Sequence, residues 1–280
     1  MKEILISLFA TLLAFTASLM LASTTKIDLI TNVVLIIFFI QWILFVPAYV
    51  FQTEKFFDLG GSMTYLAATS YILINVYLTN ELNFGNLILS SLIMIWTLRL
   101  GYFLFNRVLK KGEDNRFKLL KTSPVKFFMT WTLQGMWICI CSLCALTSIA
   151  SKTGVIINSL FYLGVVIFIL GFYIEIKADF QKKRFRAELK NKHSFINSGL
   201  WRYSRHPNYL GEIILWTGIA IMSFSSLNGY QYITLISPIF TYLLLVRISG
   251  VNILENDGQK KWGHLSDYQQ YIKDTPKLLF

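Results

Sequence analysis

The segment Gly199–Glu212 carries the side chains of this sequence that are best suited to bind a charged ligand. It reads GLWRYSRHPNYLGE and enters an apolar stretch with five candidate binding residues: Arg205, His206, Asn208, Tyr209 and Glu212. Polar and charged groups are costly near lipid, so a cluster of them at this place indicates function. Pro207 predicts the first turn of a helix, with Ser204 or His206 as its cap. Because a helix amino terminus flanked by arginines suits phosphate, the segment predicts a site for a charged cofactor.

A second polar cluster follows another apolar stretch. One helix face collects side chains three or four residues apart: Glu175, Asp179, Lys183 and Arg186. Opposite charges at this spacing also stabilise an exposed helix, so a purely structural role stays open. If the face lines a cavity, its cations suit phosphate groups and its carboxylates suit ribose hydroxyls.

A third cluster ends a further apolar stretch, where Arg99, Tyr102 and Asn106 share a helix face. Arg99 lies well inside the stretch, and an arginine at such a depth usually faces protein or a water-filled cavity. Arg107, at the edge of the stretch, fits a cation that reaches the membrane boundary. Arg99 therefore joins the candidate cofactor residues.

The composition indicates a membrane protein that positions these clusters on helices. Of 280 residues, 55% are hydrophobic and 15% charged, against about 25% charged in soluble domains. The apolar residues form eight blocks of nearly the ~20 residues that cross a bilayer as a helix. They lie at residues 4–22, 29–51, 62–79, 85–105, 127–150, 155–174, 209–226 and 230–246. The last two are short, so we predict an all-α polytopic membrane helix bundle with 7–8 transmembrane helices.

The basic residues predict the topology. With eight spans, the basic loops at 106–126 and 175–208 lie on the same side as both termini. The positive-inside rule places that side in the cytoplasm, so we expect a cell inner membrane protein whose cofactor site faces the cytoplasm. The net charge of +11 is therefore explained mainly by the basic loops on the cytoplasmic side, and it does not indicate nucleic-acid binding. The first block exceeds the usual signal-peptide core, which favours a retained helix.

Metal and nucleotide motifs of other kinds are not indicated. Cys139, Cys141 and Cys144 lie in an uncharged apolar block and are expected to be packed thiols. The three histidines are scattered, which does not indicate a metal site. Neither a G-x-G-x-x-G element after a strand nor a P-loop is found.

Several motifs together resemble the DUF1295 proteins, a group of steroid 5α-reductase-like membrane oxidoreductases. They are LWRYSRHPNYLGE, the preceding E-x-x-x-D-x-Q-K-x-x-F, the later Arg247-Ile-Ser-Gly-Val with Glu255, W-x-x-R-L from Trp96, the loop Glu113–Phe117 and the tail Trp262–Pro276. The resemblance runs from about residue 50 to the end. It implies one integral-membrane domain, with residues 1–105 on the substrate side and residues 106–280 closing the cofactor cavity with cytoplasmic loops.

The resemblance also implies NADPH as cofactor. The matching cofactor-binding positions are Asn106, Asp179, Arg186, Asn208, Glu212 and Arg247, with Tyr102, Glu175 and Lys183 as looser matches. The implied partners are membrane lipid and a lipophilic substrate of sterol, polyprenyl or acyl type. The oligomeric state stays open.

The implied chemistry is hydride transfer to a carbon–carbon double bond conjugated with a carbonyl that a donor polarises. In steroid reductases this donor pair is a glutamate and a tyrosine. Glu54 lies at the place of the glutamate, although a surface pair with Lys55 would also explain it. Ile95 stands where the tyrosine would be, which makes a steroid substrate less expected. Tyr102 is the other catalytic candidate, and Tyr65 or Tyr71 could substitute.

Two alternatives stay open. Isoprenylcysteine and phospholipid methyltransferases, which bind S-adenosylmethionine, share G-x-[WY]-x-x-x-R-H-P-x-Y and an Arg-Ile pair like Arg247-Ile248. Adjacent glutamates usually follow that pair, but Val251-Asn252 stand here. The segments Asn208–Glu212 and Glu113–Phe117 favour the reductases over the methyltransferases and over a membrane protein without enzymatic activity.

Overall fold

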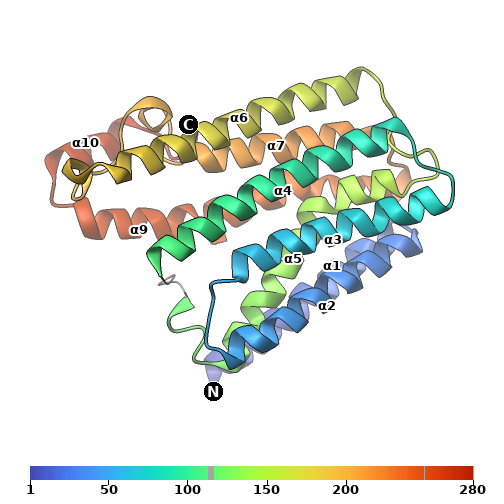
Figure 1. Cartoon of the computed structure of the whole chain (residues 1–280), viewed down its shortest axis with the longest axis horizontal. Helices are drawn as coiled ribbons and strands as arrows, with labels where there is room; N and C mark the ends of the chain where they lie inside the picture. Colours follow the sequence, from blue (N-terminus) through green and yellow to red (C-terminus); the bar gives the residue numbers. More distant parts are fainter. Residues whose placement is uncertain (113–116, 249, 280) are drawn as a thin grey trace. The chain divides into compact units, whose positions relative to one another are not determined.

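The computed structural model of the chain describes residues 1–112, 117–248 and 250–279, and these residues form helices and connecting loops without a strand (Figure 1). The helices are α1 Lys2–Thr24, α2 Asp28–Val50, α3 Phe57–Leu78, α4 Phe84–Lys111, α5 Pro124–Ile149, α6 Ser159–Ala187, α7 Pro207–Phe224, α8 Ser237–Leu243, α9 Val251–Trp262 and α10 Ser266–Asp274. Shorter helical segments are η2 Leu189–Asn191, η3 Gly199–Arg202, η4 Gly229–Ile236 and the π-helical η5 Leu244–Ile248. The predicted motif at Glu113–Phe117 lies outside the described residues, except for Phe117.

Helical structure is found at all eight predicted blocks, which confirms an all-α, multi-pass membrane protein. Within the described residues, six helical stretches are long and apolar enough to cross a membrane. The third and seventh blocks, which correspond to α3 and α7, are not among those six, and each contains polar residues, such as Asn75 in α3 and Glu212 in α7.

The eighth block lies within Gly229–Trp262, one of the six stretches that could cross a membrane, but it is not a regular α-helix throughout. It consists of η4, α8 and η5 in succession. Pro238 explains the first change, because proline lacks an N–H group and is favoured in the first turn of a helix. It lies at the start of α8. The π-helical η5 then carries Arg247.

The chain forms two compact units. The first unit contains residues 1–161 and 222–236, and the second contains residues 162–221 and 237–280. The units therefore divide the chain after residue 161 rather than near residue 105, and α6 and α7 each contribute to both. The assignment of substrate and cofactor halves stays a prediction.

Helix α5 forms the centre of the first unit and contacts α1, α2 and α3. Most of its residues are buried, including Phe127 and Trp131, which pack with Ala48 and Phe117. The three cysteines of α5 are buried in this core. This burial is what the uncharged, apolar sequence of residues 127–150 predicts.

In the second unit, glycines bring α6 and α7 into backbone contact, and Figure 1 shows the two helices side by side. A Cβ atom added to Gly211 would lie 2.6 Å from the backbone nitrogen of Glu175, and one added to Gly218 would lie 2.6 Å from that of Phe168. Small residues permit such approaches between membrane helices. The contact places the first turns of α7, with Asn208 and Glu212, beside the turn of α6 that carries Glu175 and Asp179.

Candidate functional site

Three carboxylates are buried where α6 meets α7. Glu175 is 2% exposed, and Asp179 and Glu212 are each 6% exposed. Buried carboxylates are rare unless other groups compensate them. Their positions follow from the helix period of α6 and from the glycine contact that brings α7 alongside. The structure therefore brings together three of the residues that the sequence predicts to bind the cofactor.

The start of α7 follows the predicted capping chemistry. Pro207 is the first helical residue, and the backbone N–H of Leu210 donates to the carbonyl of His206 at 3.1 Å. The hydroxyl of Ser204 accepts the backbone N–H of His206 at 3.2 Å. Asn208 is half-buried in the first turn. The turn therefore has a fixed conformation before any ligand binds.

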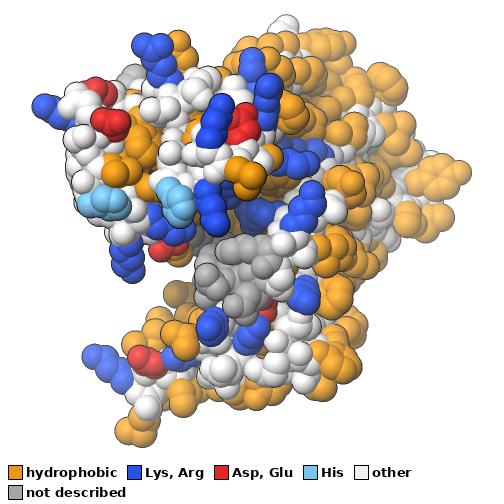
Figure 2. All heavy atoms as spheres, turned by 60° about the vertical axis from the view of Figure 1, so that its left-hand side comes forward, with side chains coloured by type: hydrophobic (Ala, Val, Ile, Leu, Met, Phe, Trp, Pro, Cys, Tyr) orange, Lys and Arg blue, Asp and Glu red, His pale blue; other side chains and the backbone are white. Residues whose placement is uncertain are grey.

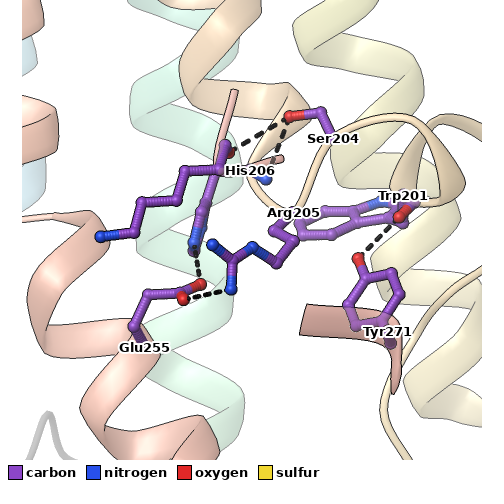
Figure 3. A network of polar contacts seen from close by, with 7 residues as sticks. Trp201, Ser204, Arg205, His206, Glu255 and Tyr271 are labelled. Carbon is purple, nitrogen blue, oxygen red and sulfur yellow. Dashed lines mark hydrogen bonds and ion pairs between the residues drawn. The ribbon is translucent and has the colours of Figure 1, made fainter. Parts of the chain in front are cut away.

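The side chains of Arg205 and His206 both point toward Glu255 of α9 (Figure 3). Arg205 Nη1 lies 2.7 Å from Oε2 of Glu255, and His206 Nε2 lies 2.8 Å from Oε1. Arg205 and His206 are both largely buried, and the His206 ring stacks on Tyr209 with centroids 5.8 Å apart. Burial lowers the pKa of His206 below its usual value, and this outweighs the opposing bond to Glu255. The network joins the start of α7 to α9.

The carboxyl-terminal segment holds the loop in front of α7. Tyr271 donates its hydroxyl to the carbonyl of Trp201 at 2.6 Å, and the backbone N–H of Arg205 donates to the carbonyl of Pro276 at 3.0 Å. On the other side of the loop, the indole N–H of Trp201 donates to the carbonyl of Ala178 in α6 at 3.1 Å. Burial raises the pKa of Tyr271 above its usual range, so its hydroxyl stays a donor. The Gly199–Glu212 segment is therefore fixed from both sides.

Several cations of the second unit lie at the surface. Lys183 and Arg186 are exposed in the last turns of α6, and Arg247 is exposed on η5. Figure 2 shows Lys and Arg side chains among those exposed on the face in view. Lys182 lies over the Trp201 ring at 4.3 Å. The exposed cations suit phosphate groups of a bound nucleotide.

The remaining predicted residues belong to the first unit. Arg99 lies over the Phe103 ring at 5.3 Å, and Tyr102 is 75% exposed. The side-chain amide of Asn106 donates to the carbonyl of Tyr102 at 2.8 Å. The predicted cofactor residues are thus distributed over both units.

Glu54 has a different partner from the one its sequence neighbours suggest. Its carboxylate, 3% exposed as a residue, lies 2.8 Å from Nζ of Lys121, whereas Lys55 is exposed. The pairing with Lys55 is therefore replaced by a buried ion pair across the first unit. Likewise, Glu255 belongs to one of the matching motifs, but its pairing with Arg205 and His206 was not predicted. The signal that could have identified it is the adjacent Arg205 and His206, because buried polar groups require a partner.

Comparisons with known proteins agree with these features. The family model described as "Protein of unknown function (DUF1295)" matches residues 44–275. Steroid 5-alpha-reductase DET2 of Arabidopsis thaliana is 37% identical over 65 residues, which cover 23% of this chain and 25% of that protein. The 3-oxo-5-alpha-steroid 4-dehydrogenase 2 of Homo sapiens is 38% identical over 65 residues, or 23% of this chain and 26% of that protein. The chain thus spans about a quarter of the length of these curated relatives. No solved structure gives a significant match.

Proposed function

The chain belongs to the DUF1295 family, and from this premise we propose that it is an NADPH-dependent membrane reductase. It transfers a hydride to a carbon–carbon double bond conjugated with a carbonyl group in a lipophilic substrate of sterol, polyprenyl or acyl type. The names of two relatives, a steroid 5-alpha-reductase and a 3-oxo-5-alpha-steroid 4-dehydrogenase, support the reaction class. Tyr102 and Glu54 are the candidates for polarising the carbonyl.

The contact of α6 with α7 is the observation that carries this proposal. This contact brings the helix turns that carry the buried carboxylates of Glu175, Asp179 and Glu212 close to the turn that carries the half-buried amide of Asn208. Carboxylates accept hydrogen bonds from ribose hydroxyls, and an amide side chain both donates and accepts. A nicotinamide carboxamide needs one donor and one acceptor, which Asn208 and Glu212 provide together. The residues therefore fit the uncharged parts of NADPH.

The charged parts of NADPH fit the exposed cations of the same unit. Lys183 and Arg186 lie on α6, and Arg247 lies on η5. One guanidinium group can donate two parallel hydrogen bonds to two oxygens of a phosphate group. Arg247 lies on a π-helical segment, and such segments frequently occur at functional sites. We assign these three cations to the phosphates of the cofactor.

When bound, NADPH would supply the hydride for the β-carbon of the conjugated double bond and become NADP⁺, and a proton from water would complete the reduction at the α-carbon. The chain's own contribution is to hold the nicotinamide ring in one orientation. Asn208 and Glu212 do this from a turn fixed by Glu255 and by the carboxyl-terminal segment. Fixed positioning of this kind supplies much of the rate acceleration in transfer reactions.

The membrane arrangement follows from the basic loops. We assign both termini and the cofactor site to the cytoplasmic side of a cell inner membrane, where positive loops are retained and NADPH is dissolved. Residues 1–105 bind the lipophilic substrate, and residues 106–280 bind the cofactor, within one integral-membrane domain.

Ligand-dependent thermal stability in detergent tests the function. A ligand bound only by the folded state stabilises it by about 2.7 kcal/mol at 100 times its Kd. NADPH should raise the midpoint of the purified protein, and S-adenosylhomocysteine should not. The opposite pattern would support the methyltransferase alternative, because Arg205 and His206 are shared with that group.

Matched variants locate the nucleotide. Arg186→Ala and Asn208→Ala should lose most of the response to NADPH while keeping the unliganded midpoint. Lys190→Ala removes an exposed cation that pairs with Glu188 and should leave the response intact. Normal binding by both Arg186→Ala and Asn208→Ala would refute the site.

A further inference from the structure

A small polar pocket lies between α3, α4 and α5 of the first unit. Its volume is about 20 Å³. The polar side chains on its wall include those of Asp58, Ser62 and Tyr65 from α3, Thr97 from α4, and Gln134 and Trp137 from α5. A space of this size holds about one water-sized group. The pocket therefore suits a single polar atom at the end of a ligand rather than a whole molecule.

Three of these side chains carry buried polar atoms that have no hydrogen-bond partner in the described part of the chain: Thr97 Oγ1, Gln134 Oε1 and Trp137 Nε1. Thr97 is 1% exposed and Gln134 is 5% exposed. Unsatisfied buried polar atoms are unfavourable and require a reason. An indole N–H donates, an amide oxygen accepts and a hydroxyl does both. Together they complement an oxygen that accepts hydrogen bonds and can also donate one.

Glycines shape the pocket for these groups. A Cβ atom added to Gly61 would lie 2.7 Å from Nε2 of Gln134, and one added to Gly101 would collide with the hydroxyl of Ser62. The Nε2 group of Gln134 donates to the carbonyl of Phe57 at 3.2 Å, which fixes the amide so that Oε1 stays unused. Because Gly61 and Gly101 have no side chains, the polar groups of Gln134 and Ser62 can reach the wall of the pocket. If the pocket served packing alone, we would expect apolar side chains in place of these polar groups.

The charges at the pocket oppose an anionic ligand. Asp58 on its wall carries a carboxylate, which lies 3.9 Å from the guanidinium group of Arg107. The other wall side chains are uncharged. A bound carboxylate or phosphate would therefore be buried beside Asp58 without a cation of its own, and an uncompensated buried charge is strongly unfavourable.

We propose that this pocket binds the uncharged oxygen, a hydroxyl or a carbonyl, at the polar end of the lipophilic substrate. Trp137 and Thr97 donate hydrogen bonds to that oxygen, and Gln134 accepts one from a hydroxyl. The proposal rests on the proposed function for the existence of a lipophilic substrate. It narrows the class to neutral lipids of the sterol or polyprenol type and excludes free fatty acids and prenyl phosphates.

Binding of end-group analogues to the full chain in detergent tests the pocket. The probes are farnesol, farnesal, farnesyl phosphate and the hydrocarbon farnesene, measured by quenching of tryptophan fluorescence. Farnesol and farnesal should bind more tightly than the other two. Thr97→Val and Gly61→Ala should weaken farnesol binding about fivefold to tenfold, the effect of one hydrogen bond. The control Thr69→Val removes an equally buried hydroxyl that bonds within α3 and should bind farnesol like the parent chain.

Equal binding of farnesene and farnesol, or unchanged farnesol binding by both Thr97→Val and Gly61→Ala, would overturn the proposal and leave a water molecule as the only occupant. The response to NADPH, measured in the same preparations, separates this failure from that of the proposed function. A parent chain that responds to NADPH but does not distinguish the end groups refutes the pocket alone. A parent chain that distinguishes them without responding to NADPH supports the pocket and refutes the cofactor.

Discussion

His206 Nε2 and Glu255 Oε1 lie 2.8 Å apart, although the two residues are 49 positions apart in the chain. The second carboxylate oxygen of Glu255 pairs with Arg205 at 2.7 Å. One carboxylate of α9 therefore compensates two buried cationic or potentially cationic groups at the start of α7. Because Asn208 and Glu212 follow directly in that helix, Glu255 positions the residues that we assign to the nicotinamide.

Replacing Glu255 with glutamine tests this relationship. The Glu255→Gln variant leaves the largely buried guanidinium of Arg205 without a countercharge. We expect the unfolding free energy to fall by about 2 kcal/mol, below the ~3–5 kcal/mol typical of fully buried pairs because Glu255 is partly exposed. Thermal unfolding in detergent measures the change. Glu188→Gln, which alters an exposed pair with Lys190, is the matched control, and an equal midpoint for both variants would contradict the role of Glu255.

The environment of His206 predicts a loss of stability in acid. Burial lowers the pKa of His206 in the folded protein below the ~6.5 of an unfolded histidine. As the pH falls through about 6.5, the unfolded state therefore binds a proton before the folded state does, and the folded protein loses stability down to its own lower pKa. Above about pH 6.5 the contribution is fully present.

Unfolding midpoints between pH 5 and 8 measure this effect. The His206→Gln variant should have a flatter profile over that range than the parent protein, whereas His264→Gln, at an exposed site, should keep the parent profile. Parallel profiles for the parent and His206→Gln would show that another group controls the acid dependence.

Gly211 is one of the glycines at which the backbones of α6 and α7 come into contact, so Gly211→Ala should separate the helices. The added Cβ would lie 2.6 Å from both the nitrogen of Glu175 and the carbonyl oxygen of Gly171, and backbone atoms cannot turn away as a side chain can. We expect a loss of about 1–3 kcal/mol in unfolding free energy, together with a weaker response to NADPH.

The variant Thr217→Ala, in the same helix, removes atoms instead of adding them and serves as the control. The Thr217 hydroxyl donates to the carbonyl of Ile213 within the same helix, so both the stability and the NADPH response of the variant should stay close to those of the parent. A Gly211→Ala protein with a normal NADPH response would show that the cofactor does not depend on this helix contact.

Local features of the sequence predict the helices and the start of α7 correctly. Apolar blocks long enough for a membrane span mark α1 to α7, and Pro207 marks the first turn of α7 because its preference acts on its own backbone. The pairing of Glu255 with Arg205 and His206 depends on how α9 packs against the start of α7. The hydrophobic periodicity of the sequence does not predict this packing. The polar pocket likewise depends on helix packing, because Gly61 leaves space for the side chain of Gln134 and Gly101 leaves space for that of Ser62. Hydropathy also does not predict the changes of helix type within the eighth block, since η4, α8 and η5 are all apolar.

The buried pair of Glu54 with Lys121 distinguishes the structure from the simplest interpretation of the sequence. The Lys121→Met variant removes the ammonium group that lies 2.8 Å from the Glu54 carboxylate, whose side chain is 2% exposed. We expect a loss of about 3 kcal/mol in unfolding free energy, measured by thermal or denaturant unfolding in detergent. Lys55→Met, next to Glu54 in the sequence but exposed, should have almost no effect. Combining Lys121→Met with Glu54→Leu should recover most of the loss, because an apolar pair of similar volume often matches a buried ion pair in stability. If Lys55→Met were as unstable as Lys121→Met, the result would support a pair between Glu54 and Lys55 and contradict the pair between Glu54 and Lys121.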